Sequence, residues 1–566
     1  MLNVARRWEL APAAPPEHFA RFGDLPAFVA QILYNRGLTD RRQVDSFLDS
    51  DGAGSHDPFA MKGMQTAVTR VVQAIARDER IVVYGDFDAD GITSTALVVQ
   101  FLQSLGARVQ PYIPHRVDEG YGLNADSVKR LVQDGTRLLI TVDCGVSSVA
   151  EIAWAQSHGM DVIVTDHHHM PTEMPSALAI LNPRQPDCRY PFKDLAGVGV
   201  AYKLAHGICM AFGRDERELA ETLDLVALGT VADLAPLLGE NRALVRRGLA
   251  QLSRPERPGL QEMMLRAGLQ RVDAGTIAFA LGPRLNAAGR MDSAMSSYHL
   301  LTTEDYSEAR RLADELESVN RERQRVTVEL HGVARRQVQE RGTDERLLLV
   351  CGDEFAPGIV GLVAGRLAEE YYRPAVVVHR GEVTSRGSAR SIPEFSIVSA
   401  LDECRDLLVR YGGHAQAAGF TVANENLAEL HRRLLAIAER ELAGLTLVPT
   451  LQVDVEVPLS GSSWQTLQWL ERLAPFGSGN PAPVLMSRQV RVWDKPRVVG
   501  RDHLRLRLAG PEGGAVLDAI GFRLGHLADE IGTHPYWDIA YCLESNQWGD
   551  YPPMLQANIK AMRVSP

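Results

Sequence analysis

The sequence DFDADG at residues 86–91 constrains this 566-residue chain more than any other segment. An apolar run of strand type, residues 81–84, precedes it, and residues typical of a helix follow it. In extended backbone, side chains two positions apart point to the same side, so we expect Asp86, Asp88 and Asp90 to converge at the C-terminal end of a strand. Three carboxylates this close are unfavourable unless a cation neutralises them. The competing interpretation is an aspartate-rich turn that caps the following helix.

Residues 61–233 alternate short apolar segments with amphipathic ones. The pattern predicts strands at residues 81–84, 107–113, 138–142, 161–165 and 179–181. With helices between them, these strands form a mostly parallel sheet that is covered on both faces.

Polar clusters follow four of the predicted strands. They are the three aspartates, the pair His115 and Arg116, the sequence DCG at residues 143–145 and the sequence DHHH at residues 166–169. Because the carboxyl ends of parallel strands share one edge of a sheet, the clusters predict a ligand site at that edge.

Carboxylates together with imidazoles suit divalent cations such as Mn²⁺ or Mg²⁺. We expect two ions bridged by a shared aspartate, which would neutralise the charge, activate a water and stabilise the charge that develops in phosphoryl displacement. None of the six cysteines forms a CxxC pair, which argues against a zinc ribbon and predicts reduced thiols in a cytosolic protein. No P-loop, dinucleotide fingerprint or serine nucleophile elbow competes with this interpretation.

Charge and hydropathy set wider limits. The net charge of −11 does not indicate a nucleic-acid binder, although a basic groove can exist on an acidic body. No apolar run reaches the length of a membrane span, so we expect neither export nor membrane insertion.

The middle of the chain predicts a connection and a second α/β unit. Residues 302–339 are charged and favour a helix, which either connects two lobes or is simply solvated. Strand and helix patterns return near residue 346. We expect residues 282–290, 385–391 and 411–419 to be loops, and the glycines, hydroxyls and arginines of the last two suit phosphate contacts.

After residue 446, dense short strands predict a small barrel of the OB type. Its locally basic stretch, residues 491–507, fits either single-strand binding or a solvated sheet face.

Several motifs in this order resemble a known family. DFDADG, DCG, DHH at residues 166–168 and VAD at residues 231–233 resemble the four motifs of the DHH phosphoesterase superfamily, and GGH at residues 412–414 resembles the signature of its partner domain, DHHA1. IPHRVDEGYGL at residues 113–123, PRLNAAGR at residues 283–290 and APFGSGNP at residues 474–481 narrow the resemblance to the branch of single-strand-specific 5′→3′ DNA exonucleases. The resemblance covers nearly the whole chain.

The resemblance implies an α/β fold with two lobes, DHH and DHHA1, joined by a long helix and followed by an OB-fold barrel. The expected segments are an N-terminal extension (1–60), the DHH domain (61–300), the connecting helix (301–343), the DHHA1 domain (344–445) and the OB-fold domain (446–566).

The resemblance also assigns roles to residues. The implied metal ligands are Asp88, Asp90, Asp143, His167 and Asp233, with Asp143 as the bridge and Asp86 more a supporting residue than a ligand. His168 is expected to contact the scissile phosphate or support the attacking water, and Arg290 to act beside it. The residues implied to hold the 5′ end and the strand are Arg116, Ser388, Arg390, Gly412, Gly413, His414 and Arg284.

The implied activity is the release of nucleoside 5′-monophosphates from single-stranded DNA in repair and recombination. The family implies a cytoplasmic monomer with single-strand-binding protein and a RecQ-type helicase as partners. One departure concerns Ala356 and Pro357, which stand where family members often carry Trp-His; a strand contact made there by relatives is in doubt.

Two alternatives stay open. One is a phosphoesterase of the same superfamily that acts on short oligonucleotides or cyclic dinucleotides, against which the long linker and the barrel argue. The other is a non-catalytic Cdc45-like replication scaffold, against which the intact ligand set argues.

Overall fold

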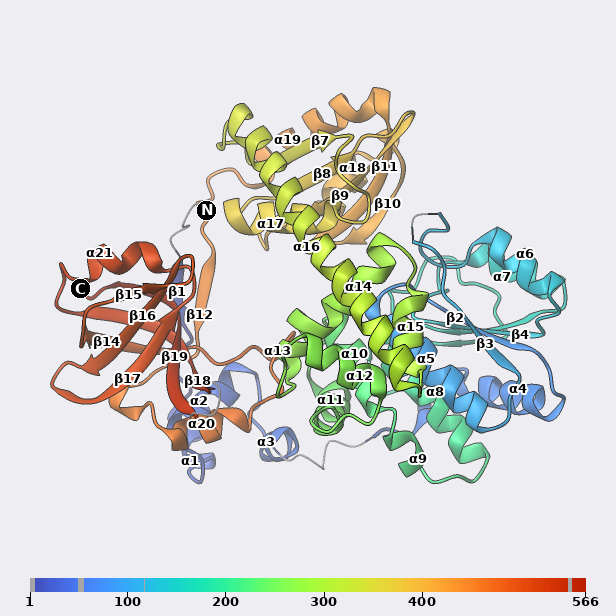
Figure 1. The fold of residues 1–566 in the computed structure, drawn as a ribbon, viewed down its shortest axis with the longest axis horizontal. Helices are drawn as coiled ribbons and strands as arrows, with labels where there is room; N and C mark the ends of the chain where they lie inside the picture. The colour runs from blue at the N-terminus through green and yellow to red at the C-terminus, as the bar shows by residue number, and fades with distance from the viewer. Residues whose placement is uncertain (1–5, 49–54, 117, 548–551) are drawn as a thin grey trace. The chain divides into compact units, whose positions relative to one another are not determined.

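The computed structural model describes residues 6–48, 55–116, 118–547 and 552–566. The chain divides into two compact units (Figure 1). The first unit comprises Ser55–Ala235 and Glu240–Val448. The second, which we call the barrel unit, comprises residues 6–48, Pro236–Gly239 and Pro449–Pro566.

A parallel sheet forms the N-terminal half of the first unit. Its strand order is β3 (Val109–Tyr112), β2 (Ile81–Gly85), β4 (Leu138–Val142), β5 (Asp161–Thr165) and β6 (Ala179–Leu181). Helices α6 (Ala125–Gln133) and α7 (Val149–Ser157) share a buried core with one face of the sheet. The other face contacts α5 (Ala89–Ser104) and α8 (Gly197–Ala211). The carboxyl ends of β2, β4 and β5 therefore lie side by side, as the sequence predicts.

A 36-residue helix, α16 (Tyr306–Arg341), connects the two halves of the first unit. Its N-terminal part packs on α14 (Gly282–Met291) and α15 (Met295–Thr302), and its C-terminal part packs on α17 (Val360–Tyr371). Of the two interpretations of this segment, the connecting helix is correct (Figure 1). The loop expected at residues 282–290 is wrong, because Pro283 fits the first turn of a helix and the small residues after it let α14 pack closely.

The second sheet has the strand order β10 (Leu408–His414), β11 (Ala417–Ala423), β9 (Thr384–Arg390), β8 (Ala375–His379) and β7 (Leu348–Gly352). Two further expected loops are therefore wrong, since residues 385–391 and 411–419 lie mostly in β9, β10 and β11. Gly387 is a packing glycine rather than a loop glycine: it pairs with Phe420 on β11, and a Cβ there would lie 2.2 Å from the Phe420 ring.

In the barrel unit, five strands close a barrel in the order β14 (Leu485–Val492), β16 (His503–Gly510), β17 (Gly513–Gly521), β19 (Met554–Val564) and β18 (Trp537–Asn546), which returns to β14. The OB-type barrel is thus confirmed. Helices α2 (Ala27–Asn35), α3 (Arg41–Leu48) and α20 (Trp464–Glu471) share its hydrophobic core. Strand β1 (Arg7–Leu10) pairs in parallel with β12 (Thr450–Val453), so residues 6–48 pack with the C-terminal part of the chain.

The domain boundaries given by the resemblance stay a prediction.

Among the helices that the structure describes, none is both long and apolar enough to cross a membrane.

Candidate metal centre

The junction between β2 and α5 gathers the first three acidic residues. Strand β2 ends at Gly85, and Asp88 is the N-cap of α5, where its carboxylate accepts hydrogen bonds from the N–H groups of Asp90 and Gly91 at 3.0 and 3.1 Å. Asp90 already lies in the first helical turn. The expected extended run through all three aspartates is therefore wrong. Capping and clustering occur together, because among the described residues the main-chain donors reach only one carboxylate oxygen of Asp88 and leave the other unbonded by main chain.

Asp90 is held by the N-terminus of α8. Its Oδ2 accepts from Gly197 N–H at 2.7 Å and its Oδ1 from Val198 N–H at 2.8 Å. Burial and the neighbouring charge of Asp88 nevertheless raise the pKa of Asp90 to about 7. Gly197 has a second role, since a Cβ at this position would lie 2.6 Å from Asp143 Oδ1. Only glycine lets α8 approach both carboxylates.

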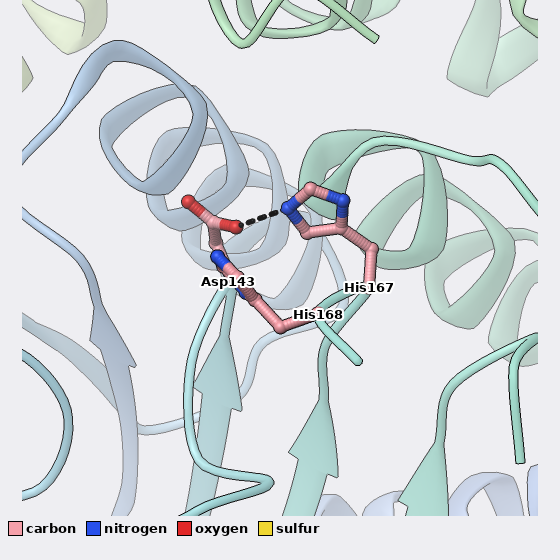
Figure 2. A group of neighbouring side chains, drawn as sticks. All are labelled: Asp143, His167 and His168. Carbon is pink, nitrogen blue, oxygen red and sulfur yellow. Dashed lines mark ion pairs between the residues drawn. The ribbon is translucent and has the colours of Figure 1, made fainter. Parts of the chain in front are cut away.

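Asp143 and His167 face each other at the ends of β4 and β5 (Figure 2). Asp143 has φ +61°, a left-handed conformation that is uncommon for residues other than glycine, and its N–H donates to Thr165 O at 3.0 Å. His167 Nε2 lies 3.1 Å from Asp143 Oδ1, and 3.9 and 3.8 Å from the carboxylates of Asp90 and Asp233. His167 thus stands among three carboxylates from separate elements.

Asp233 comes from α10 (Leu223–Ala232), where it is the C-cap residue. Burial, with the charges of Asp90 and Asp88, raises its pKa to about 9. This carboxylate is therefore the fourth acidic contribution to one crowded site.

The buried Asp166 orients His168. One carboxylate oxygen of Asp166 accepts from His168 Nδ1 at 2.7 Å and from the N–H groups of His167 and His168 at 2.8 and 3.0 Å. The hydroxyl of Tyr121 lies 3.1 Å from His168 Nδ1 on the exposed side. Burial acts to lower the pKa of His168, but the hydrogen bond and charge of Asp166 outweigh it and raise that pKa to about 9.

The donor set fits divalent cations. Three groups of side chains each bring ligand atoms within 4.8 Å of one another: Asp143, His167 and His168; Asp90, His167 and Asp233; Asp86, Asp88 and Asp143. Asp143 and His167 each belong to two groups. Burial raises the pKa of Asp86 and of Asp143 well above the usual range, and the same burial lowers the pKa of His167 to about 3.

Unsatisfied atoms point to the same conclusion. Asp86 Oδ1, Asp143 Oδ1 and His167 Nε2 are buried without a well-formed hydrogen bond to any residue that the structure describes. Such atoms are costly unless another group pairs with them. Cations between the carboxylates would satisfy all three.

Arginines from both halves of the first unit lie beside this centre. The guanidinium of Arg116 lies over the Phe87 ring, 4.6 Å from its centroid. Arg390 donates to Ser388 Oγ at 3.2 Å, and Arg290 to Gly358 O at 3.3 Å. Burial, together with the charges of Arg116, Arg323 and Arg390, lowers the pKa of Arg290 to about 9. Like charges held together in this way indicate a place for an anion.

The other predicted strand contacts are placed differently. His414, at the end of β10 after Gly412 and Gly413, lies against His169, with ring centroids 5.5 Å apart. Arg284 instead forms an ion pair with Glu317 of α16 at 2.8 Å through Nε, and its Nη1 donates to Ala280 O at 2.9 Å.

Sequence reasoning gave no role to Asp166, Gly197 or Tyr121. Asp166 and Tyr121 lie inside quoted motifs, so a signal was present for them. Gly197 carries no such signal, because its importance comes from contacts with Asp90 and Asp143 that are distant in sequence.

Comparison with known proteins defines the class first. Residues 80–230 match the DHH family, N-terminal domain, and residues 344–443 match the DHHA1 domain. With the carboxylates and imidazoles at the strand ends, which could hold metal ions, these matches define a metal-dependent phosphoesterase of the DHH superfamily.

The particular family is defined by the barrel and by relatives. Residues 453–560 match the RecJ OB domain. The chain is 39% identical to the single-stranded-DNA-specific exonuclease RecJ of Bacillus subtilis, over 92% of this chain and 66% of that protein. It is 36% identical to the RecJ exonuclease of Dickeya dadantii, over 97% of both. The chain belongs to the RecJ family of exonucleases.

Solved structures of RecJ support the same family membership. The crystal structure of RecJ from Thermus thermophilus in complex with Mn²⁺ matches with a TM-score of 0.83 and 30% identity, over 99% of this chain and 80% of that one. The corresponding complex with Mg²⁺ matches with a TM-score of 0.77 and 29% identity, over 99% and 79%. Mn²⁺ and Mg²⁺ are thus the ions bound in relatives of this fold.

Proposed function

We propose that this chain is an exonuclease that degrades single-stranded DNA from the 5′ end and releases nucleoside 5′-monophosphates, in DNA repair and recombination. Membership of the RecJ family supports the substrate and the reaction. The observation that carries the proposal is the arrangement of Asp143 and His167, each of which belongs to two neighbouring groups of ligand atoms. Such sharing suits two adjacent cations.

Asp88, Asp90, Asp143, His167 and Asp233 would hold two Mn²⁺ or Mg²⁺ ions, with Asp143 between them and Asp86 as a neighbouring acid. When bound, the ions lower the pKa of a water and stabilise charge on the phosphate oxygens. The chain's own residues do the positioning. Asp166 fixes the His168 ring, which would contact the scissile phosphate or support the attacking water.

Arg116, Ser388 and Arg390 would bind the 5′ phosphate. Arg290 and His414 would contact the strand near the cut, with Gly412 and Gly413 bringing the main chain of β10 close. Guanidinium groups suit phosphate because they donate paired hydrogen bonds. Arg284 already donates from Nε to Glu317, so a contact with the strand would use its other N–H groups.

The family resemblance alone supports three further statements about the cellular context. The chain would act as a monomer, and its partners would be single-strand-binding protein and a RecQ-type helicase. A cytoplasmic location is supported by the six cysteines, all of which are free thiols.

The experiment is the degradation of end-labelled single strands, with and without a 5′ phosphate, in Mg²⁺ and in Mn²⁺. A 5′ label should appear in mononucleotides at once, whereas a 3′ label should stay in shortening strands. Rapid cleavage of dinucleotides with no activity on long strands would instead assign the chain to the short-oligonucleotide phosphoesterases.

A further inference from the structure

The motif APFGSGNP, residues 474–481, takes no part in the proposed reaction, yet several hydrogen bonds fix the conformation of its loop. Gly477 N–H donates to Asn480 O at 2.8 Å, and Asn480 N–H donates back to Gly477 O at 3.2 Å. The fully buried amide of Asn480 donates to Leu473 O at 2.9 Å and to Pro475 O at 2.7 Å. Its oxygen accepts from Arg36, which follows α2. The loop is thus fixed within the barrel unit.

This loop holds Pro236–Gly239, which we call the tether. These residues belong to the barrel unit although they interrupt the first unit in sequence. Leu237 N–H donates to Ser478 O at 2.8 Å, and the Leu237 side chain is buried. A Cβ on Gly477 would lie 2.8 Å from Leu237 Cδ1, and one on Gly479, which has φ +70°, would lie 3.1 Å from Pro236 Cβ. Both glycines permit the close approach.

The tether begins three residues after Asp233. One residue spans at most about 3.6 Å, so the chain between them has little slack. Ala235 is buried, and its N–H donates to Thr230 O at 3.2 Å. Hydrogen bonds therefore hold the main chain at both ends of the short segment from Asp233 to Leu237.

Asp233 depends on its main chain more than Asp88 and Asp90 do. The carboxylates of Asp88 and Asp90 each accept two main-chain N–H groups. The Asp233 carboxylate accepts none from the residues that the structure describes, and it lies 3.8 Å from His167 Nε2, too far for a hydrogen bond. Its position is set by the end of α10 and by the main chain from Leu234 to the tether.

We propose that Leu237 is a positioning residue for Asp233. Its anchorage in the 474–481 loop fixes the main chain after α10, and this keeps the Asp233 carboxylate in place for the cation shared with Asp90 and His167. The inference rests on the proposed role of Asp233 as a metal ligand. It gives the APFGSGNP motif a function: the motif anchors the segment of main chain that follows Asp233.

The test is the Mn²⁺ affinity of the full chain without DNA, measured by electron paramagnetic resonance. Gly479→Ala should displace the tether and weaken Mn²⁺ binding about tenfold, the usual scale for residues that support a ligand. The matched control is Gly500→Ala, in the same unit, with a similar φ of +61° and its nearest contact on the His503 side chain. The control should bind Mn²⁺ as the wild type does. Wild-type affinity in Gly479→Ala would overturn the proposal.

A second variant avoids any damage to the loop. Two glycines inserted between Ala235 and Pro236 leave the tether seated but add slack, and they should weaken Mn²⁺ binding to a similar extent. Unchanged affinity there would also overturn the proposal. Asp233→Asn separates the two levels: if it binds Mn²⁺ normally, the ligand assignment itself fails, whereas weak binding in Asp233→Asn with normal binding in the insertion variant refutes only the tether.

Discussion

At the scale of single residues, the candidate metal centre depends on the close packing of main chain against its carboxylates as much as on charge. Asp88 caps a helix with one carboxylate oxygen, which leaves the other for the proposed cation, and Asp90 receives two N–H groups from the start of α8. The N-terminus of a helix stabilises a nearby negative charge. This arrangement keeps several carboxylates together in a buried site before any cation binds.

Gly197 is the residue on which that approach depends. Gly197→Ala would place a methyl group 2.6 Å from Asp143 Oδ1, so we expect metal affinity and nuclease activity to fall by about ten- to a hundredfold. Gly199→Ala, half a turn on, meets only the Leu195 side chain and should stay near wild type. Calorimetric Mn²⁺ titration of both variants checks this, and equal behaviour of the two would contradict it.

The proposed binding of the 5′ phosphate can be tested at Arg390. Arg390→Ala should remove the preference for a 5′-phosphorylated strand, at a cost of about 1.5–3 kcal/mol in binding, since a charge-assisted hydrogen bond has this value. Arg386, on the same strand but more exposed, supplies the control. Competition between phosphorylated and unphosphorylated strands measures the effect, and an unchanged preference in Arg390→Ala would exclude Arg390 from the pocket.

At the scale of elements, hydrophobic patterning predicts the parallel sheet well. The strands expected at residues 138–142, 161–165 and 179–181 have those bounds in the structure, because each is a short apolar run buried on both faces. Patterning fails for β9 and β11, where Gly387 makes room for Phe420 on the paired strand. A glycine required by a partner distant in sequence looks like a loop glycine. Alternation is also hard to see in β10, which is largely exposed.

The buried pair of Lys203 on α8 and Glu240 on α11 (Gly239–Leu252) links two elements next to the centre. Their side chains are 0% and 1% exposed, and the charged atoms lie 2.6 Å apart. Glu240→Gln leaves a buried ammonium without its counter-ion, so we expect a loss of about 3–5 kcal/mol in unfolding free energy. Glu429→Gln removes an exposed ion pair on α19 (Leu427–Glu441) and should change little. Urea denaturation compares them, and equal losses would contradict the argument.

At the scale of the whole molecule, residues 6–48 and the C-terminal part of the chain join in one unit. The parallel pairing of β1 with β12 and the core shared by α2, α3 and the barrel could not be predicted, since no local pattern identifies partners more than four hundred residues apart. Asp88, Asp143 and His167 were predictable for the opposite reason, because they follow strands whose order fixes where they meet. Asp233 follows the helix α10, and only the resemblance gave it a role. The contact of Leu237 with the 474–481 loop is intermediate in how far it could be predicted from the sequence.

The central claim is that Asp143 serves two neighbouring cations in a centre that hydrolyses single-stranded DNA. The most direct measurement is the release of nucleoside 5′-monophosphates by the wild type and by Asp143→Ala, across Mg²⁺ and Mn²⁺, with circular dichroism to confirm that both are folded. We predict metal-dependent release by the wild type and a loss of about a thousandfold or more in the variant, since about 4 kcal/mol of transition-state stabilisation disappears. Substantial metal-dependent release by folded Asp143→Ala would contradict the account.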